Sequence, residues 1–238
     1  MTIPADQVLA TTTHTALITA TKHEGLGNDF LIVIDPARSL TPDDARSWCD
    51  RRLGVGADGL IWLDTTPSAP RMVLFNADGS RAEISGNGIR CVAQALARHG
   101  GMTGPARFTV DTDAGPRHLD LTPLDDAVVE VSVDMGSVKP GPPLYDHWSD
   151  RAVDVERQAS VDLGNPHLVA LVDELHRYDM GVVGPAVESA YPDGLNVHLI
   201  AVDDRSRIRL KVWERGSGVT QACGSGASAA GASVIDWG

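Results

Sequence analysis

The feature that most constrains this chain is an internal repeat, because short motifs of the first half recur in order in the second. The turn Gly27-Asn28 enters an apolar run, and Gly164-Asn165 does the same at a shift of about 137 residues. Asp58-Gly59 is echoed by Asp193-Gly194 in the same way. We therefore expect both halves to share one order of elements: strand, Gly-Asn turn, strand, short helix, strand, polar turn, Gly-rich turn and helix.

The chain of 238 residues is long enough for two small domains. Residues 128–134 alternate apolar and polar side chains as a strand does, so we place the boundary near residue 126, with domains 1–126 and 127–238. Residues 1–15 are expected to form a loose extension. The first half continues about 36 residues further past its Gly-rich turn than the second half does. We therefore expect the second domain to be truncated at Gly238 or completed by other means.

Each Gly-rich turn opens a predicted helix. After Asn87, apolar residues recur at i, i+3, i+4 and i+7 from Ile89 to Leu96, and Gly100 ends the run. The segment after Ser225 is rich in Ala and Gly, which favours a helix buried on several sides.

Composition excludes several functional classes. The net charge of −12 repels phosphate backbones and anionic lipid, and we find no local basic cluster. Three cysteines without C-x-x-C spacing argue against disulfides and a zinc site and favour a reducing cytoplasm. The first twenty residues have neither the charge pattern of a leader peptide nor the length of a membrane span. We expect a cytoplasmic protein with no nucleic-acid, membrane or metal partner.

The two Gly-rich turns suit an anion, because backbone N–H groups at a helix N-terminus attract a carboxylate or phosphate. A plain helix start is the commoner explanation for either turn alone. Their relation by the repeat favours a pair of helix ends that holds one small anion. Neither turn matches a nucleotide-binding motif.

Cys223 directly precedes one of these helix starts, where a thiol pKa falls below about 8.5. Burial as a small apolar residue is the commoner fate of a free cysteine, and it fits Cys49 and Cys91. Glu214-Arg215 and the equivalent Asn76 would suit the amino and carboxylate groups of a zwitterion. The asparagines of the other turns are uninformative one by one, because Asn is common in turns.

The motifs together resemble the diaminopimelate epimerases, members of the cofactor-independent amino-acid racemase superfamily. The resemblance implies an α+β fold of two pseudo-symmetric domains, each a β-barrel-like mixed sheet around a central helix, with the active site in the interdomain cleft. It also implies a small-molecule amino-acid substrate, no cofactor, no pyridoxal phosphate, no metal, and a monomer or homodimer. The matching stretches are KHEGLGNDF from Lys22, RLGVGADGL from Arg52, FNADGSRAEISGNGIRC from Phe75, GNPH from Gly164, Asn196-Val197, and ERGSGVTQACGSG from Glu214.

Carried over by position, the resemblance implies a set of site residues. Cys223 and Ser85 take the two catalytic positions, and His167 lies near them. Glu214 and Arg215 are matched to the distal amino-acid end of the substrate. Gly59 replaces a substrate-binding Gln of many members, which puts that contact in doubt. The remaining substrate-binding positions are Asn28, Asn76, Gly86, Asn87, Asn165, Asn196, Gly224 and Ser225.

Ser85 is the main departure, since the family has a catalytic cysteine there. A hydroxyl ionises far less readily than a thiol, and a helix dipole contributes only about 0.3–1 kcal/mol, or about 2 kcal/mol when buried. Three explanations stay open: a Cys-to-Ser trap, altered one-base chemistry such as dehydration or slow racemisation, or binding without turnover. Cys91 lies too far inside its helix to substitute.

The sequence therefore predicts an isomerase that interconverts LL- and meso-2,6-diaminopimelate in lysine and cell-wall precursor synthesis. The alternative is a degenerate homologue that binds a zwitterionic amino acid. A sugar- or nucleic-acid-binding protein has little support, because the aromatic residues are not interleaved with basic ones.

Overall fold

The computed structural model describes residues 9–13, 16–145, 148 and 153–238, and it divides into two compact units. The first unit is residues 1–134 and the second is residues 135–238. The change of unit lies eight residues after the predicted boundary of 126, since β9 (Val129–Val133) pairs with β8 (Gly115–Pro123) and so belongs to the first sheet.

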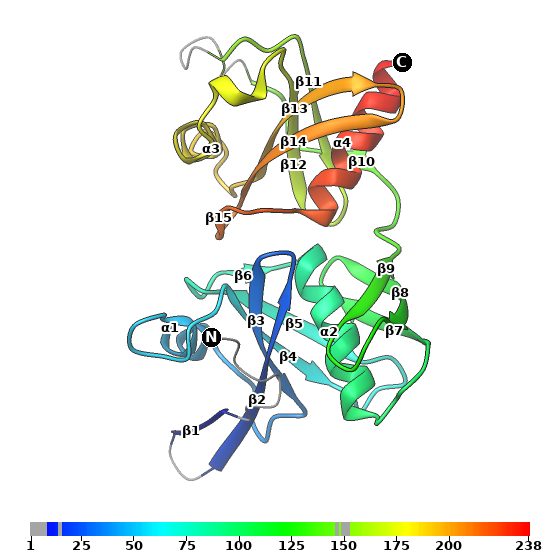
Figure 1. Cartoon of the computed structure of the whole chain (residues 1–238). Helices are drawn as coiled ribbons and strands as arrows, with labels where there is room; N and C mark the ends of the chain where they lie inside the picture. The colour runs from blue at the N-terminus through cyan, green and yellow to red at the C-terminus, as the bar shows by residue number, and fades with distance from the viewer. Residues whose placement is uncertain (1–8, 14–15, 146–147, 149–152) are drawn as a thin grey trace. The chain divides into compact units, whose positions relative to one another are not determined.

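The first unit is a mixed sheet with helices on both of its faces (Figure 1). The strand order is β1-β2-β3-β4-β5-β7-β8-β9, and β6 pairs with β5. Leu9–Thr13 form a strand against β2, so this part of the predicted loose extension is ordered; residues 1–8 and 14–15 lie outside the described residues. The elements are β1 (Leu9–Thr13), β2 (Ala16–Gly25), β3 (Asn28–Ile34), α1 (Pro42–Cys49), β4 (Gly59–Asp64), β5 (Arg71–Asn76), β6 (Arg81–Ala82), α2 (Gly86–His99), β7 (Ala106–Thr112), β8 (Gly115–Pro123) and β9 (Val129–Val133).

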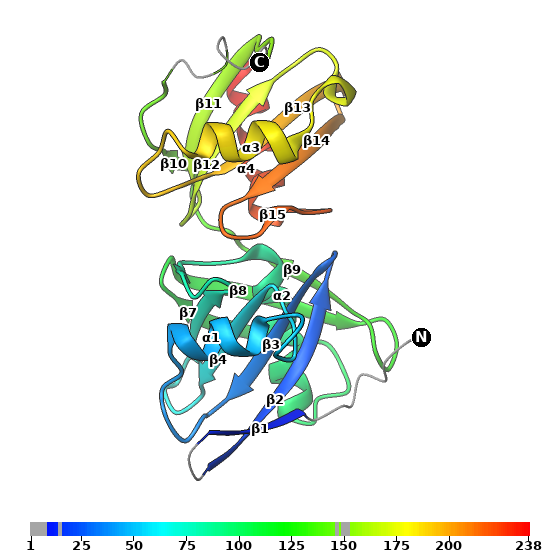
Figure 2. The ribbon, with the colours of Figure 1, turned by 90° about the vertical axis from the view of Figure 1, so that its left-hand side faces the viewer.

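The sheet of the first unit curls around α2. This helix contacts β2 and β3 toward one end of the strand order and β8 and β9 at the other. α1 covers the opposite face of β3 and β4, where Ala45 and Trp48 are buried against Leu31 and Leu60 (Figure 2). The predicted helix after Asn87 and its end near Gly100 are both confirmed.

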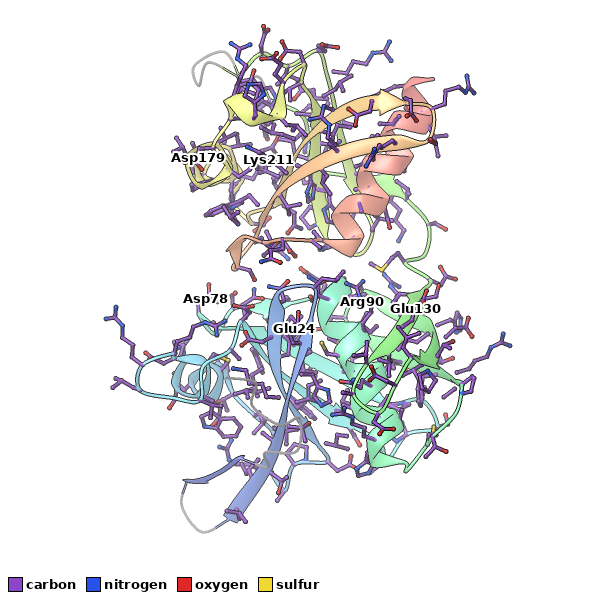
Figure 3. The ribbon with its side chains drawn as sticks, viewed as in Figure 1. Glu24, Asp78, Arg90, Glu130, Asp179 and Lys211 are labelled. Atoms are coloured by element: carbon purple, nitrogen blue, oxygen red, sulfur yellow. The ribbon has the colours of Figure 1, made fainter. Side chains whose placement is uncertain are left out.

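The second unit repeats this arrangement with fewer strands. Its strand order is β10-β11-β12-β13-β14-β15. Asp179 is the N-cap residue of α3, and its carboxylate accepts a hydrogen bond from Gly181 N. Next to Asp179, the backbone oxygen of Tyr178 accepts a hydrogen bond of 2.7 Å from Lys211 of β14 (Figure 3). The elements are β10 (Lys139–Pro140), β11 (Arg157–Asp162), β12 (Pro166–Leu171), a 3-10 turn η2 (Leu175–Arg177), α3 (Met180–Glu188), β13 (Asn196–Asp204), β14 (Arg207–Glu214), β15 (Gly218–Val219) and α4 (Gly224–Trp237).

α4 packs on the face of this sheet opposite α3 (Figure 2). Ala229 and Ala230 are fully buried there against Val169 and Ile200. The prediction that α4 is buried on several sides is wrong, since Ala227 and Ser228 are exposed and only one stripe of small residues faces the sheet.

The repeat is a repeat of topology, as predicted. In each unit a parallel pair is joined through a short helix, β3 with β4 and β12 with β13, and an antiparallel strand and a longer helix follow. Phe30 pairs with Gly59 in one unit, and His167 pairs with Asn196 in the other. This register makes Gly59 the equivalent of Asn196, so the sequence echo between Asp58-Gly59 and Asp193-Gly194 is two residues out of step.

Candidate functional site

In the first unit, Ser85 is the N-cap residue of α2. Its Oγ accepts a hydrogen bond from Gly88 N at 3.0 Å, and its backbone is extended as an N-cap requires. Gly86 and Asn87 supply the first two N–H groups of the helix, which have no carbonyl partner within the helix. Ser85 is half-buried at this positive helix end.

The predicted asparagines of this unit are buried, and Asn28 and Asn87 lie together at the start of α2. Asn87 Nδ2 donates to Asn28 Oδ1 at 2.5 Å, and Asn28 Nδ2 donates to Asp58 Oδ2 at 3.0 Å. Arg90, on the next turn of α2, donates to Asn87 Oδ1 (Figure 3). Asn76 ends β5, and its Nδ2 donates to Ser80 Oγ at 2.9 Å. Each amide is thus fixed by its neighbours.

Gly59 has no room for a longer side chain in this structure. A Cβ there would lie 2.9 Å from Phe75 O and 3.1 Å from the Phe30 ring. A Gln side chain at this position would require the strands to shift.

In the second unit, Cys223 is the N-cap residue of α4. Its Sγ accepts a hydrogen bond from Gly226 N at 3.3 Å and lies 3.4 Å from Ser225 Oγ. Ser85 and Cys223 thus occupy the same position at the start of equivalent helices. Only 3% of the Cys223 surface is exposed.

The prediction that this helix end lowers the pKa of Cys223 is wrong. Burial is the main cause that raises this pKa to about 12, and the nearby Glu214 carboxylate raises it further. The hydrogen bonds from Ser225 and Gly226 act in the opposite direction but are weaker. Desolvation disfavours the thiolate more than one helix end can favour it, so Cys223 is a protonated thiol at neutral pH in this state.

Glu214 and Arg215 end β14 beside this helix start. The Glu214 carboxylate accepts a hydrogen bond from Thr220 Oγ1, a contact absent from the sequence reasoning. Arg215 donates from its side chain to Asp193 O at 3.1 Å and from its backbone to Asn196 Oδ1 at 3.1 Å. Asn196 is therefore joined to Arg215, and Glu214 is held by Thr220.

His167 is fully buried in a short hydrogen-bonded chain. Its Nε2 lies 2.8 Å from Asn165 Oδ1, and its Nδ1 lies 2.8 Å from His198 Nε2. Burial, with Arg215 as a smaller cause, lowers the pKa of His167 to about 3. Burial and the neighbouring His167 also lower the pKa of His198. Both rings are neutral at physiological pH.

Sequence reasoning missed His198, although the sequence held a signal for it. Asn165-Pro166-His167 and Asn196-Val197-His198 both have the form Asn-x-His at the start of a strand. Alternate residues of a strand share a face, so both motifs direct an asparagine and a histidine to the same side. Cys49 and Cys91 are buried, as predicted for packing residues, and burial raises the pKa of each to about 12.

No group of three or more metal-ligating side chains occurs in the part of the chain that the structure describes. Among the same residues, no helix combines the length and apolar character needed to cross a membrane.

Two units, each with a side chain that caps a helix packed on a mixed sheet, form an α+β fold of the kind seen in solved epimerase and racemase structures. A predicted epimerase from Pseudomonas aeruginosa has this fold, with a TM-score of 0.67 and 19% identity over 89% of this chain and 77% of that one.

The chain belongs to the diaminopimelate epimerase family, whose profile matches residues 20–140 and 159–236. The diaminopimelate epimerase of Thermosynechococcus vestitus is 41% identical over 87% of this chain and 79% of that protein. That of Pelotomaculum thermopropionicum is 41% identical over 88% of this chain and 81% of that protein.

Proposed function

We propose that the protein is an amino-acid epimerase that interconverts LL- and meso-2,6-diaminopimelate by proton transfer at the α-carbon, without a cofactor. This reaction serves lysine and cell-wall precursor biosynthesis. Family membership supports the substrate. The observation that carries the chemistry is the equivalence of Ser85 and Cys223, each of which caps the helix that follows the Gly-rich turn of its unit.

In the proposed mechanism, Cys223 and Ser85 act on opposite faces of one α-carbon. Cys223 is held as a thiol by burial, so it is ready to donate a proton to a carbanion. To remove a proton in the reverse direction, it must first ionise. The helix-end N–H groups at Gly86, Asn87, Gly224 and Ser225 then stabilise the substrate carboxylate as negative charge develops next to it.

The polar groups that surround the two helix starts suit a zwitterionic substrate. Amide groups such as those of Asn28 and Asn196 hydrogen-bond to both ammonium and carboxylate groups. Arg215 is suited to a carboxylate and Glu214 to an ammonium group, so we assign them to the distal end of the substrate. Asn76, Asn87 and Asn165 complete the proposed binding set.

Ser85 limits the rate in this proposal. A base should have a pKa near the operating pH, and a serine hydroxyl is far from that range. Removal of the α-proton on the Ser85 face is therefore the slow step in one direction. A thiol at this position would restore a usable base.

The test is exchange of the substrate α-hydrogen with deuterium from solvent, followed by proton NMR of LL-diaminopimelate. We expect slow exchange by the native protein and no exchange by Cys223→Ala. Ser85→Cys should raise the rate by about 10²–10⁴-fold, the usual contribution of a positioned acid or base. Cys91→Ala is the matched control, because Cys91 is a buried cysteine of α2 that the mechanism does not use.

Three outcomes separate the alternatives. Exchange that depends on Cys223 excludes the degenerate homologue. If the native protein binds diaminopimelate without exchange and Ser85→Cys gives exchange, the native protein is a binding protein that lacks only the second acid–base group. If Ser85→Cys also gives no exchange, the epimerase proposal is refuted.

A further inference from the structure

The hydrogen bonds among Asn165, His167 and His198 have a fixed direction. Asn165 Oδ1 only accepts, so His167 Nε2 must carry the proton of this ring. Because both rings are neutral, His167 Nδ1 is then an acceptor and His198 Nε2 is its donor. His198 Nδ1 is left as a lone pair, and it has no hydrogen-bond partner among the described residues.

The reverse direction is less favourable. It would require the Asn165 amide to turn over and would leave an N–H group, rather than a lone pair, unpaired at the fully buried His198 Nδ1. Buried donors without a partner are rarer than buried acceptors without one. The direction runs from His198 through His167 to Asn165.

The first unit shows that packing alone does not need these two histidines. The strand register makes Phe30 the equivalent of His167 and Ile61 the equivalent of His198. Ile61 packs against Gly88 at the start of α2, as His198 packs against Gly226 at the start of α4. An apolar pair therefore fills the same place beneath the equivalent helix. Two buried imidazoles, one with an unsatisfied nitrogen, stabilise the fold less than such an apolar pair would. This cost indicates that the histidines have a role other than packing.

We propose that His198 is a positioning residue, which holds His167 in its Nε2–H form and thereby fixes the Asn165 amide with its NH₂ group directed to the ligand. The Asn165 oxygen is occupied by His167, and the amide nitrogen has no partner in the described part of the chain. Asn165 is therefore presented as a hydrogen-bond donor, suited to a carboxylate oxygen. The inference rests on the proposed function in taking that ligand to be an amino acid.

The start of α4 holds His198 in place. A Cβ at Gly226 would lie 2.3 Å from His198 Cε1 and 2.7 Å from its Nε2, so the ring lies directly against the glycine. Gly226 N is the group that donates to Cys223 Sγ. The ring thus packs directly on the start of α4, and this contact restrains its position next to His167.

The first test reads the ring nitrogens directly and does not depend on activity. In nitrogen-15 NMR of histidine-labelled protein at pH 7, both His167 and His198 should carry their proton on Nε2. His198→Leu should remove this preference at His167, because its Nδ1 loses the donor. His198→Gln should retain it, since the Gln amide nitrogen reaches a similar place. A proton on His167 Nδ1 in the native protein would overturn the inference.

The second test measures binding of LL-diaminopimelate by calorimetry. We expect His198→Leu to weaken binding about tenfold, which corresponds to about 1.4 kcal/mol. His198→Gln should stay within about twofold of the native affinity. If His198 acts through Asn165, His198→Leu should have no further effect in an Asn165→Ala background.

Ile200→Val is the matched control, because Ile200 lies on the same face of β13 as His198 and packs against α4, and its apolar side chain makes no hydrogen bond. It should alter stability but neither the tautomer of His167 nor binding. Equal weakening by His198→Leu with and without Asn165 would show a purely structural role and refute the inference. If the native protein binds no diaminopimelate, the proposed function fails, and the NMR result still decides the role of His198. If His198→Leu does not fold, the native spectrum and His198→Gln decide it.

Discussion

Two glycines of α4 should respond in opposite ways to the same substitution. Gly226 lies against the His198 ring, whereas a Cβ at Gly231 would have no atom within 4 Å. Both are inside the helix Gly224–Trp237. Alanine at either position gains helix propensity, so the difference between the two variants isolates the contact with His198.

The magnitudes follow from the geometry. Replacement of a helical glycine by alanine stabilises by about 0.5–1 kcal/mol where there is space, which is the expectation for Gly231→Ala. At Gly226 the new Cβ would lie 2.3 Å from His198 Cε1, so the fully buried ring must move. Overpacking costs about 1–3 kcal/mol, and the lost hydrogen bond to His167 costs about 1 kcal/mol more. We expect Gly226→Ala to destabilise by about 1–3 kcal/mol.

Urea unfolding, followed by circular dichroism, measures both changes against the native protein. The two variants should differ by about 1.5–4 kcal/mol in the free energy of unfolding of the second unit, which is the sum of the two expected effects. A Gly226→Ala protein as stable as Gly231→Ala would refute the close packing of His198 against α4. It would also remove the proposed restraint on the ring.

Three further predictions concern protons and a helix cap. Unfolded histidines bind protons below about pH 6.5, but buried His167 and His198 do not. The free energy of unfolding should therefore fall by about 3 kcal/mol for the pair as the pH is lowered from 6.5 toward 5. Urea unfolding at each pH should show a smaller dependence on pH for His198→Gln than for the native protein. Because the pKa of Cys223 is raised to about 12, its alkylation by iodoacetamide at pH 8 should be about a thousandfold slower than that of free cysteine, and mass spectrometry showing rapid modification would contradict this. Thr41→Ala should destabilise the first unit by about 1 kcal/mol in thermal unfolding, because Thr41 and Asp44 form a capping box at α1; an unchanged melting temperature would count against it.

The sequence was sufficient to predict much of the order of elements, because turns, apolar runs and helix ends are local features that the repeat doubles. It missed one strand of each half, since β4 with β5, and β13 with β14, stand where a single strand was expected. It did not give the strand register. The Asp58-Gly59 echo is two residues out of step with the pairing that aligns Gly59 with Asn196. Turn residues can recur for local reasons, whereas pairing depends on contacts between distant strands.

The electrostatics of the candidate site was the least predictable part. A helix start next to Cys223 is visible in the sequence, but its burial and its distance from Glu214 arise only when the chain folds. The same holds for His198, whose role depends on His167 from another strand and on Gly226 from α4. The predicted boundary at residue 126 lies before β9 for a similar reason, because the pairing of β9 with β8 is a contact that only the folded chain makes.

The shared capping geometry of Ser85 and Cys223 has a consequence for local order. A thiolate accepts a hydrogen bond about twice as strongly as a neutral sulfur does. When Cys223 loses its proton, the bond from Gly226 N therefore strengthens and the first turn of α4 tightens. The Ser85 hydroxyl ionises far less readily than a thiol, so in the resting protein the bond from Gly88 N does not change when Cys223 ionises. Fraying at one helix end thus reports the proton on the sulfur, while the other end is insensitive to it.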